Sequence, residues 1–348
     1  MSAIAATAHA HAAGATTSAP PRRPSTGQRF WWTGFAAAAT WLALGAVTRV
    51  WPNRAAGFSD WAYTDELGLA AYGAAGLLLA LAVLGIAGTR IARVTHAVRP
   101  AGAWLIVLPL LLGAWEVLTA KTGRLPTPFF APPQNLVEVY GDDWQRLGNS
   151  AWHSLRLLAH GFAIGTVCGF LTGVAIGWSR GIGYWVHPVI RFVGPIPASA
   201  LLPLAFFTFP SSYAAAVFVI AFATFFPMTI LTWSGVASVN RQYYDVARTL
   251  GASEWFLVLR VAIPAALPQV FVGLFMALGA SFSVLVIAEM MGVKAGLGWY
   301  LTWAQGWASY GNMYAALIIM AVICSSTVTL LFVLRDRVLS WQKGTLKW

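Results

Sequence analysis

The stretch DVARTLGASEWFLVLRVAIPAALP, residues 245–268, carries four charged residues in the middle of an unusually apolar chain. Upstream of it, Asn240 can cap a short helix, and Gly251 can end that helix in the left-handed conformation that glycine adopts at low cost. Ser253 can cap a second helix whose first turn holds Glu254, where the helix dipole favours an acid. Pro264 is expected to close this second helix. The pattern predicts a helix–turn–helix elbow.

The chain around this elbow has the composition of a membrane protein. Hydrophobic residues make up 58% of the 348 residues and charged residues only 9%, whereas soluble domains carry about 25% charged residues. The net charge of +11 is therefore expected to mark cytoplasmic loops rather than nucleic-acid binding. Cys168 and Cys324 lie in apolar runs without metal-ligand spacing, and we expect them to be packing residues.

Eight segments are long and apolar enough to be membrane spans, for which about 20 residues are needed. They are residues 30–47, 67–88, 101–120, 157–178, 192–209, 213–236, 269–288 and 313–334. Pro195, Pro197 and Pro203 interrupt the fifth segment, which is therefore expected to be bent. The proline-rich loop 121–150 is expected to hold a short surface helix around residues 135–144.

The distribution of Lys and Arg predicts that both termini are cytoplasmic. With eight spans, fifteen of the 22 basic residues fall on the side of the N-terminus and seven on the other side, and basic residues favour the cytoplasm. The elbow then lies in the cytoplasm. Residues 1–29, rich in Ala, Thr, Ser and Pro, are expected to be a disordered cytoplasmic tail, and residues 335–348 a basic cytoplasmic tail.

The elbow resembles the EAA motif of ABC importer permeases. Asp245 takes the position of the motif's Glu, Val246 and Ala247 those of its two Ala residues, and Gly251 that of its Gly. The motif's closing Leu-Pro is Ile-Pro at residues 263–264. The Asp and the Val depart from the usual pattern. In that family the motif forms a coupling helix that docks in a groove of a cytoplasmic ATPase.

Other stretches resemble the nitrate/sulfonate/taurine/bicarbonate branch of these permeases. They are GPIPASALLPL (194–204), VLVIAEMMG (284–292), GLGWYL (296–301) and RVLSWQKG (337–344), whereas FTFPSS (207–212) lacks the usual glycine turn. The resemblance covers about 250 residues, from residue 101 to the C-terminus. It implies an all-α integral membrane protein with the type I ABC importer permease fold. Residues 101–334 would be its six-span core with a coupling helix at 240–264, and residues 30–100 an additional transmembrane hairpin.

The resemblance also implies that the nucleotide is bound by another chain. No Gly-x-x-x-x-Gly-Lys-Ser/Thr phosphate loop occurs, and the dipeptide Gly-Lys is absent. The chain is therefore expected not to be an enzyme and to hold no cofactor, with ATP and Mg²⁺ on a partner ATPase. The residues assigned to ATPase coupling are Asp245, Ala247, Arg248, Gly251, Ala252 and Pro264.

Five further residues are candidates for the translocation path or its gate: Pro195, Pro197, Ser281, Ser283 and Glu289. Serines in membrane helices usually bond back to their own helix, so a path-lining role competes with that interpretation. A carboxylate in a span usually faces protein or a water-filled cavity. Glu289 could form an ion pair with Lys294 or Arg156, or take part in gating.

The sequence therefore predicts the permease subunit of an ABC importer in a bacterial inner membrane. The expected partners are cytoplasmic ATPase subunits, a periplasmic or lipid-anchored solute-binding protein and a second copy of the permease. The expected substrate is a small anion or polar organic solute, such as nitrate, a sulfonate, taurine or bicarbonate. A secondary transporter and a non-transporting membrane scaffold are the alternatives. The secondary transporter lacks support from internal repeats or from several mid-membrane acids. In the scaffold the cytoplasmic patch would merely bind lipid.

Overall fold

The computed structural model of the chain describes residues 30–54, 61–86 and 92–342, and within these ranges every regular element is helical. The predicted tail 1–29 lies outside the described residues, as do residues 343–348. Six described helices are long and apolar enough to cross a membrane, and the bent pair α7–α8 makes a possible seventh span. Eight spans were predicted. The segment predicted as the first span, α1 (Trp32–Val50), is not among those found, because Thr, Gly and Arg49 lower its mean hydropathy.

The first compact unit runs to Asn53 and continues from Thr64 to Val117. In it, α1 packs against both α2 (Thr64–Ile86) and α4 (Gly102–Glu116). The short helices α3 (Ala92–Val98) and η2 (Arg99–Ala101) precede α4. A small apolar cluster of Trp31, Ala37, Ala38, Leu78 and Ala82 fills the centre of the unit. The helix predicted at 101–120 therefore lies beside the N-terminal hairpin.

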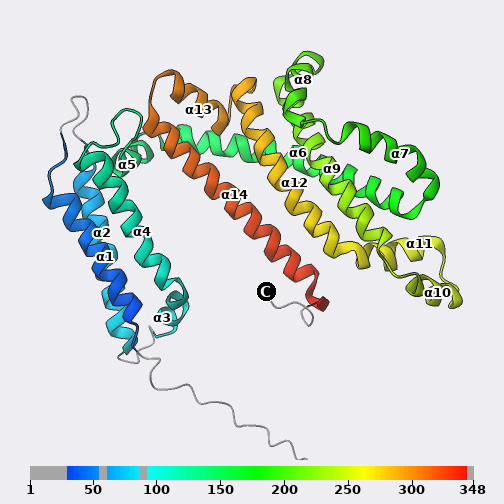
Figure 1. The fold of residues 1–348 in the computed structure, drawn as a ribbon, viewed down its shortest axis with the longest axis horizontal. Coiled ribbons are helices and arrows are strands. Elements are labelled where there is room, and N and C mark those ends of the chain that lie inside the picture. Colours follow the sequence, from blue (N-terminus) through cyan, green and yellow to red (C-terminus); the bar gives the residue numbers. More distant parts are fainter. Residues whose placement is uncertain (1–29, 55–60, 87–91, 343–348) are drawn as a thin grey trace, which may run out of the picture. The chain divides into compact units, whose positions relative to one another are not determined.

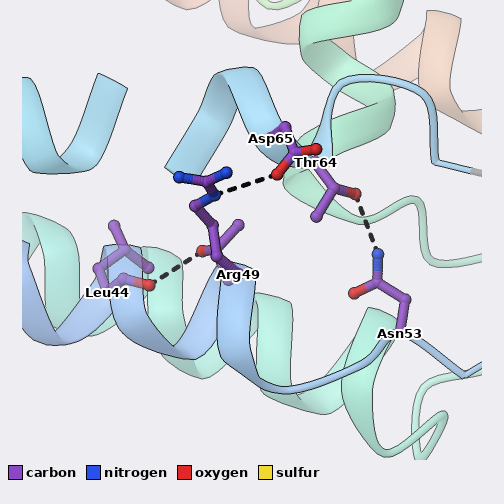
Figure 2. A network of polar contacts seen from close by, with 6 residues as sticks. Leu44, Arg49, Asn53, Thr64 and Asp65 are labelled. Atoms are coloured by element: carbon purple, nitrogen blue, oxygen red, sulfur yellow. Dashed lines mark hydrogen bonds and ion pairs between the residues drawn. The ribbon is translucent and has the colours of Figure 1, made fainter. Parts of the chain in front are cut away.

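Polar contacts join the end of α1 to the start of α2 (Figure 2). Arg49 Nε donates to Asp65 Oδ1 at 3.0 Å, and Asn53 Nδ2 donates to the hydroxyl of Thr64 at 3.0 Å. Asp65 lies in the first turn of α2, where the helix dipole also favours an acid. These contacts hold the two helices as an antiparallel hairpin.

The second unit contains residues 54–63 and everything from Leu118 on. The π turn η3 (Val117–Lys121) contains the boundary between the units. The short surface helix α5 (Pro133–Asp142), which was predicted at 135–144, follows it in the chain. Its longest α-helix, α6 (Trp144–Trp178), has 35 residues. That is about 52 Å at 1.5 Å per residue, against about 30 Å for the hydrocarbon core of a bilayer. The helix starts at Trp144 instead of residue 157 because nothing between these positions breaks it.

A row of five glycines on α6 packs against α9 (Ser212–Ala237). They recur at four-residue spacing: Gly161, Gly165, Gly169, Gly173 and Gly177. A Cβ added at Gly169 would lie 2.8 Å from both Met228 Cβ and the Phe225 carbonyl oxygen, and the other four positions are equally closed. Small residues at such spacing let helix backbones approach closely in membranes. The row therefore fixes α6 directly on α9.

The other side of α9 packs against α12 (Ile263–Met291). Gly235 of α9 leaves no room for a Cβ, which would lie 2.9 Å from Gln269 Cβ. A buried cluster that includes Leu157, Ile220 and Leu285 joins all three helices. Together α6, α9 and α12 form one packed layer (Figure 1).

The fifth predicted span is a bent pair, as its prolines indicated. Helix α7 (Arg180–Val193) meets η4 (Ala198–Leu201) and α8 (Leu202–Thr208) at 84° across residues 194–197. The helical part begins at Arg180 rather than at residue 192, because Ser179 caps it by accepting a hydrogen bond from the Ile182 amide at 3.4 Å. The bend lies where Pro195 and Pro197 follow Gly194.

The elbow lies at one end of α12 and a short helix at the other (Figure 1). The elbow consists of α10 (Arg241–Thr249), α11 (Glu254–Phe256) and the π-helical segment η5 (Leu257–Ala262), which leads into α12. At the far end, α13 (Leu297–Gly306) follows, then α14 (Tyr310–Val338) and η6 (Ser340–Gln342). Helix α12 is therefore connected to the elbow at one end and to α13 at the other.

Candidate coupling site

The elbow is built by the caps that the sequence predicted. The Asn240 side chain accepts a hydrogen bond from the Gln242 amide at 3.0 Å and starts α10. The Ser253 hydroxyl accepts from the Phe256 amide at 3.4 Å and starts α11. Each cap satisfies an amide that the first turn of a helix leaves without an intrahelical partner.

The turn between the two helices is a Schellman motif. Gly251 has φ +81°, its amide donates to the Arg248 carbonyl at 2.9 Å, and the Ala252 amide donates to the Ala247 carbonyl at 3.1 Å. This is the hydrogen-bond pattern that ends a helix in a left-handed residue. The prediction that Gly251 ends this helix in a left-handed conformation is confirmed. Ala247 and Ala252 contribute main-chain atoms to this turn.

The tip of the elbow is an exposed surface of mixed character. Arg248 Nη2 donates to Glu254 Oε1 at 3.2 Å across the turn. Asp245, which precedes Arg248 in α10, is also exposed. Large apolar side chains are also exposed on it: Tyr243, Val246, Leu250, Trp255 and Phe256, with Leu250 83% exposed. An apolar surface with charges at its edge is typical of a site that binds another protein.

The root of the elbow is packed into the helix layer. The Tyr244 ring lies edge-on to Trp178 at the end of α6, with centroids 5.5 Å apart. Ala262 and Ala266 pack with Val236 at the end of α9. Burial raises the pKa of Tyr244, although Arg248 lowers it, so this phenol is neutral at physiological pH. The elbow is therefore held against the ends of two membrane helices.

The second helix of the elbow does not end at Pro264, which corrects the prediction. Glu254–Met291 is one continuous helical rod of 38 residues. Pro264 stands in the first turn of α12, directly after the π-helical segment Leu257–Ala262. A proline lacks the amide that an α-helix needs, and a π segment is a common local adjustment around such a site. Pro264 thus lies inside the rod, well away from the elbow tip.

The bend between α7 and α8 borders an apolar cavity of about 470 Å³. Gly194, Ile196 and Ala198 line it from the bend, and residues of α9 and α12 line it from the layer, among them Phe226, Met276 and Val284. Pro195 and Pro197 alternate with these residues and are exposed. The lining contains no charged side chain.

The two candidate serines bond back to their own helix. Ser281 is fully buried and donates to the Leu278 carbonyl at 2.8 Å, and Ser283 donates to the Gly279 carbonyl at 3.3 Å. Ala280 and Val284, which alternate with these serines, line the cavity instead. The structure therefore does not bring the serines into that lining.

Glu289 is buried, with 1% of its surface exposed, near the end of α12. Its Oε2 accepts hydrogen bonds from Ser154 Oγ at 2.9 Å and from the Gly298 amide at 2.8 Å. These partners replace the expected ion pair with Lys294 or Arg156. The reason is geometric, since the chain after α12 turns so that the Gly298 amide, in the first turn of α13, points at the carboxylate.

A polar network that the sequence analysis missed lies next to α13. Tyr300 is fully buried, and its hydroxyl donates to Asp143 Oδ2 at 2.6 Å and accepts from Asn312 Nδ2 at 2.7 Å. Arg146 lies 3.7 Å from the same Asp143 oxygen and 4.5 Å from the Trp303 ring centroid. The network joins α6, α13 and the start of α14. The spacing of these residues along the chain does not follow a motif from which the network could have been predicted.

The two cysteines are free, and Cys168 is exposed on α6 while Cys324 is half-buried. Cys168 is therefore not the buried packing residue that its apolar surroundings suggested. Among the described residues, no group of three or more His, Cys, Asp or Glu side chains could hold a metal ion.

These features define a helical membrane protein in which a continuous rod of 38 residues has an exposed elbow at one end and the α13 contact at its other end. Residues 165–341 match the family model described as "binding-protein-dependent transport system inner membrane component". This match covers half of the chain, and the chain belongs to that family of membrane permeases.

Several curated proteins share the similarity. The nitrate import permease protein NrtB of Synechococcus elongatus is 29% identical, over 70% of this chain and 88% of its own length. The bicarbonate transport system permease protein CmpB of the same species is 34% identical, over 57% and 67%. The putative aliphatic sulfonates transport permease protein SsuC of Escherichia coli is 30% identical, over 64% and 88%. The similarity confirms the family branch inferred from the sequence motifs.

Proposed function

We propose that this chain is the membrane-spanning subunit of an ATP-driven importer, and that its elbow transmits the conformational change of a partner ATPase to the membrane helices. One observation carries the proposal: the elbow tip is exposed, and its second helix continues without a break through Glu254–Met291. A partner that moves the tip would tilt a rod long enough to cross the bilayer. Such a rigid-body movement is a recognised way to switch between two open sides.

The partner at the elbow is proposed to be a cytoplasmic ATPase. The chain has no phosphate loop of its own, so ATP and Mg²⁺ would be bound by that partner. The Leu250 and Trp255 side chains offer apolar anchors, and the Arg248–Glu254 pair offers a polar rim. Hydrolysis would then take place on the partner, while this chain conducts the solute.

The orientation follows if α1 also crosses the membrane. Since α1 runs antiparallel to α2 along its length, a crossing by α2 carries α1 back through the same bilayer. The spans then number eight, and both termini and the elbow lie on the side with fifteen of the 22 basic residues. We place that side in the cytoplasm and the protein in a bacterial inner membrane.

The substrate is proposed to be a small anion. The names of the three relatives specify nitrate, bicarbonate and aliphatic sulfonates, all of them anions. The cavity at the α7–α8 bend holds no cation that would select among them. Selection is therefore assigned to a solute-binding protein that delivers the anion from outside. A second copy of the chain would cover the exposed apolar residues that line this cavity, Ile196, Ile230 and Met276.

The test is reconstitution of the permease in proteoliposomes with its proposed partners, an ATPase and a solute-binding protein. The proposal expects uptake of labelled nitrate, bicarbonate or an alkanesulfonate that requires all three proteins and ATP. Uptake driven by an ion gradient without ATP would instead identify a secondary transporter. A permease that neither retains an ATPase nor transports any of these anions would be a scaffold.

A further inference from the structure

The far end of the rod is fastened to α13 by a single buried carboxylate. Glu289 lies in the last turn of α12, and its Oε2 accepts from the Gly298 amide at 2.8 Å. That amide belongs to the first turn of α13, where backbone amides have no intrahelical partner. The carboxylate therefore caps a helix that follows it in the chain.

The glycines around this contact show how closely the two elements meet. Gly296 has φ +104°, and a Cβ there would overlap the Glu289 carboxylate. A Cβ on Gly298 would lie 2.8 Å from Glu289 Cβ. The main chain at the start of α13 is thus in direct contact with the Glu289 side chain. A movement of either one is therefore transmitted to the other.

Ser154 brings α6 into the same contact. Its hydroxyl donates to Glu289 Oε2 at 2.9 Å and accepts from the Leu297 amide at 2.8 Å. Ser154 is 3% exposed and Glu289 is 1% exposed, so water does not compete for these bonds. Two successive amides at the start of α13 are thereby held, one by each side chain.

The contact lies at the opposite end of the rod from the elbow, beside a polar pocket of about 420 Å³. Residues from the α5–α6 region and from the α12–α13 connection line that pocket, among them Asp142, Arg146, His153, Lys294 and Trp299. Gly296 belongs to the pocket wall and to the Glu289 contact alike. A shift of the pocket wall therefore reaches the end of the rod through Glu289.

We propose that Glu289 and Ser154 are positioning residues that form the joint between the elbow rod and α13, so that events at the outer face and at the elbow occur together. This inference rests on the proposed function. It assigns the joint one task, namely to make ATP hydrolysis at the elbow depend on the solute-binding protein at the other end. A cap with a purely structural task would stabilise the fold without affecting that dependence.

The experiment uses the complete transporter in nanodiscs or proteoliposomes, with Glu289→Gln and Ser154→Ala as separate and combined changes. Glu66→Gln, in an exposed acid of the first unit, is the matched control. The measurements are ATP hydrolysis with and without the loaded solute-binding protein, anion uptake per ATP, and thermal unfolding. Ser154→Ala removes only a hydroxyl group, so it serves as the decisive variant if Glu289→Gln assembles poorly.

The joint predicts that each variant keeps its basal hydrolysis within about twofold and loses about fivefold or more of the stimulation by the solute-binding protein, the size of a typical allosteric coupling. Uptake per ATP falls by a similar factor. The combined variant is no worse than the worse single one, because both changes open the same joint.

If Ser154→Ala and Glu289→Gln show the same ratio of ATP hydrolysis with and without the solute-binding protein as the wild type, the proposed joint is wrong. This holds even if their melting temperature is lower, because the two residues then serve only as a structural cap. A wild-type transporter that shows no stimulation and no uptake overturns the proposed function instead. The two failures are therefore distinguishable.

Discussion

Arg248 and Glu254 meet across Gly251, with 3.2 Å between Nη2 and Oε1, so that an ion pair spans the turn of the elbow. Gly251, at φ +81°, forms the turn itself. The pair brings the end of α10 to the start of α11, and the second of these helices continues into the membrane rod. The shape of the elbow thus depends on one backbone conformation, with an ion pair to support it.

The first prediction concerns this backbone conformation. Gly251→Pro should abolish transport while the protein still inserts into the membrane, because proline fixes φ near −65° and removes the amide that bonds to Arg248. Gly251→Ala should cost about 1–2 kcal/mol for a left-handed non-glycine residue. Uptake and membrane abundance are measured side by side. Gly76→Ala in α2, which has open space around it, is the control. Normal uptake by Gly251→Pro at equal abundance contradicts the coupling role.

The second prediction is that the Arg248–Glu254 pair contributes little to stability. Both side chains are more than half exposed, and such pairs give about 0.2–1 kcal/mol in double-mutant cycles. Arg248→Ala, Glu254→Ala and the double variant should therefore unfold within a few degrees of the wild type. The small coupling that remains should vanish at 1 M salt, where the Debye length is about 3 Å. A coupling that persists at high salt would show that the pair is shielded from water.

The caps and turn of the elbow were predictable from sequence because each depends on a single residue and its immediate neighbours. Asn240, Gly251 and Ser253 act as expected. The continuation of the rod past Pro264 was not predictable in the same way, since the π segment before it and the packing of Ala262 and Ala266 against Val236 appear only in the folded chain. A proline disfavours the interior of a helix, but whether the helix ends there depends on how it packs against neighbouring helices.

The partners of Glu289 were missed for a different reason. Ser154 precedes it by 135 positions and Gly298 follows it by nine, and neither separation follows a helical or strand period. The sequence identified the carboxylate as unusual in a membrane span, which is as far as composition and depth can lead. The glycine row on α6 was not predicted either, although its four-residue spacing is visible in the sequence and is typical of close helix packing in membranes.

The third prediction concerns that row. Gly169→Ala should destabilise the protein by about 1–3 kcal/mol, the usual cost of extra atoms in a closed interface. The new methyl group would lie 2.8 Å from Met228 Cβ and the Phe225 carbonyl oxygen. Thermal unfolding in detergent measures the loss. Gly148→Ala on the same helix, where a Cβ meets nothing within 4 Å, should be neutral or slightly stabilising. Equal behaviour of the two variants would contradict the packing of α6 on α9.

The fourth prediction concerns the Tyr300 network and pH. Burial raises the pKa of Tyr300 above its usual range, and the hydrogen bond to Asp143 raises it further. A raised folded-state pKa means that the stabilisation is fully present below the unfolded value near 10 and is lost only as the pH rises through the folded value. Tyr300→Phe removes the hydroxyl and should cost roughly 1–3 kcal/mol, as expected for a buried hydrogen bond to a charged group.

The cost of Tyr300→Phe should therefore be the same at pH 6 and pH 9, and its measurement is the difference in melting temperature from the wild type at each pH. Asn312→Ala removes a donor to the same hydroxyl and should behave alike, since Asn312 Nδ2 lies 2.7 Å from it. A difference that shrinks between pH 6 and pH 9 would mean that the phenol ionises in this range. Tyr300 could not then donate to Asp143, and α13 would have to be held to α6 by Ser154 and Glu289 without this network.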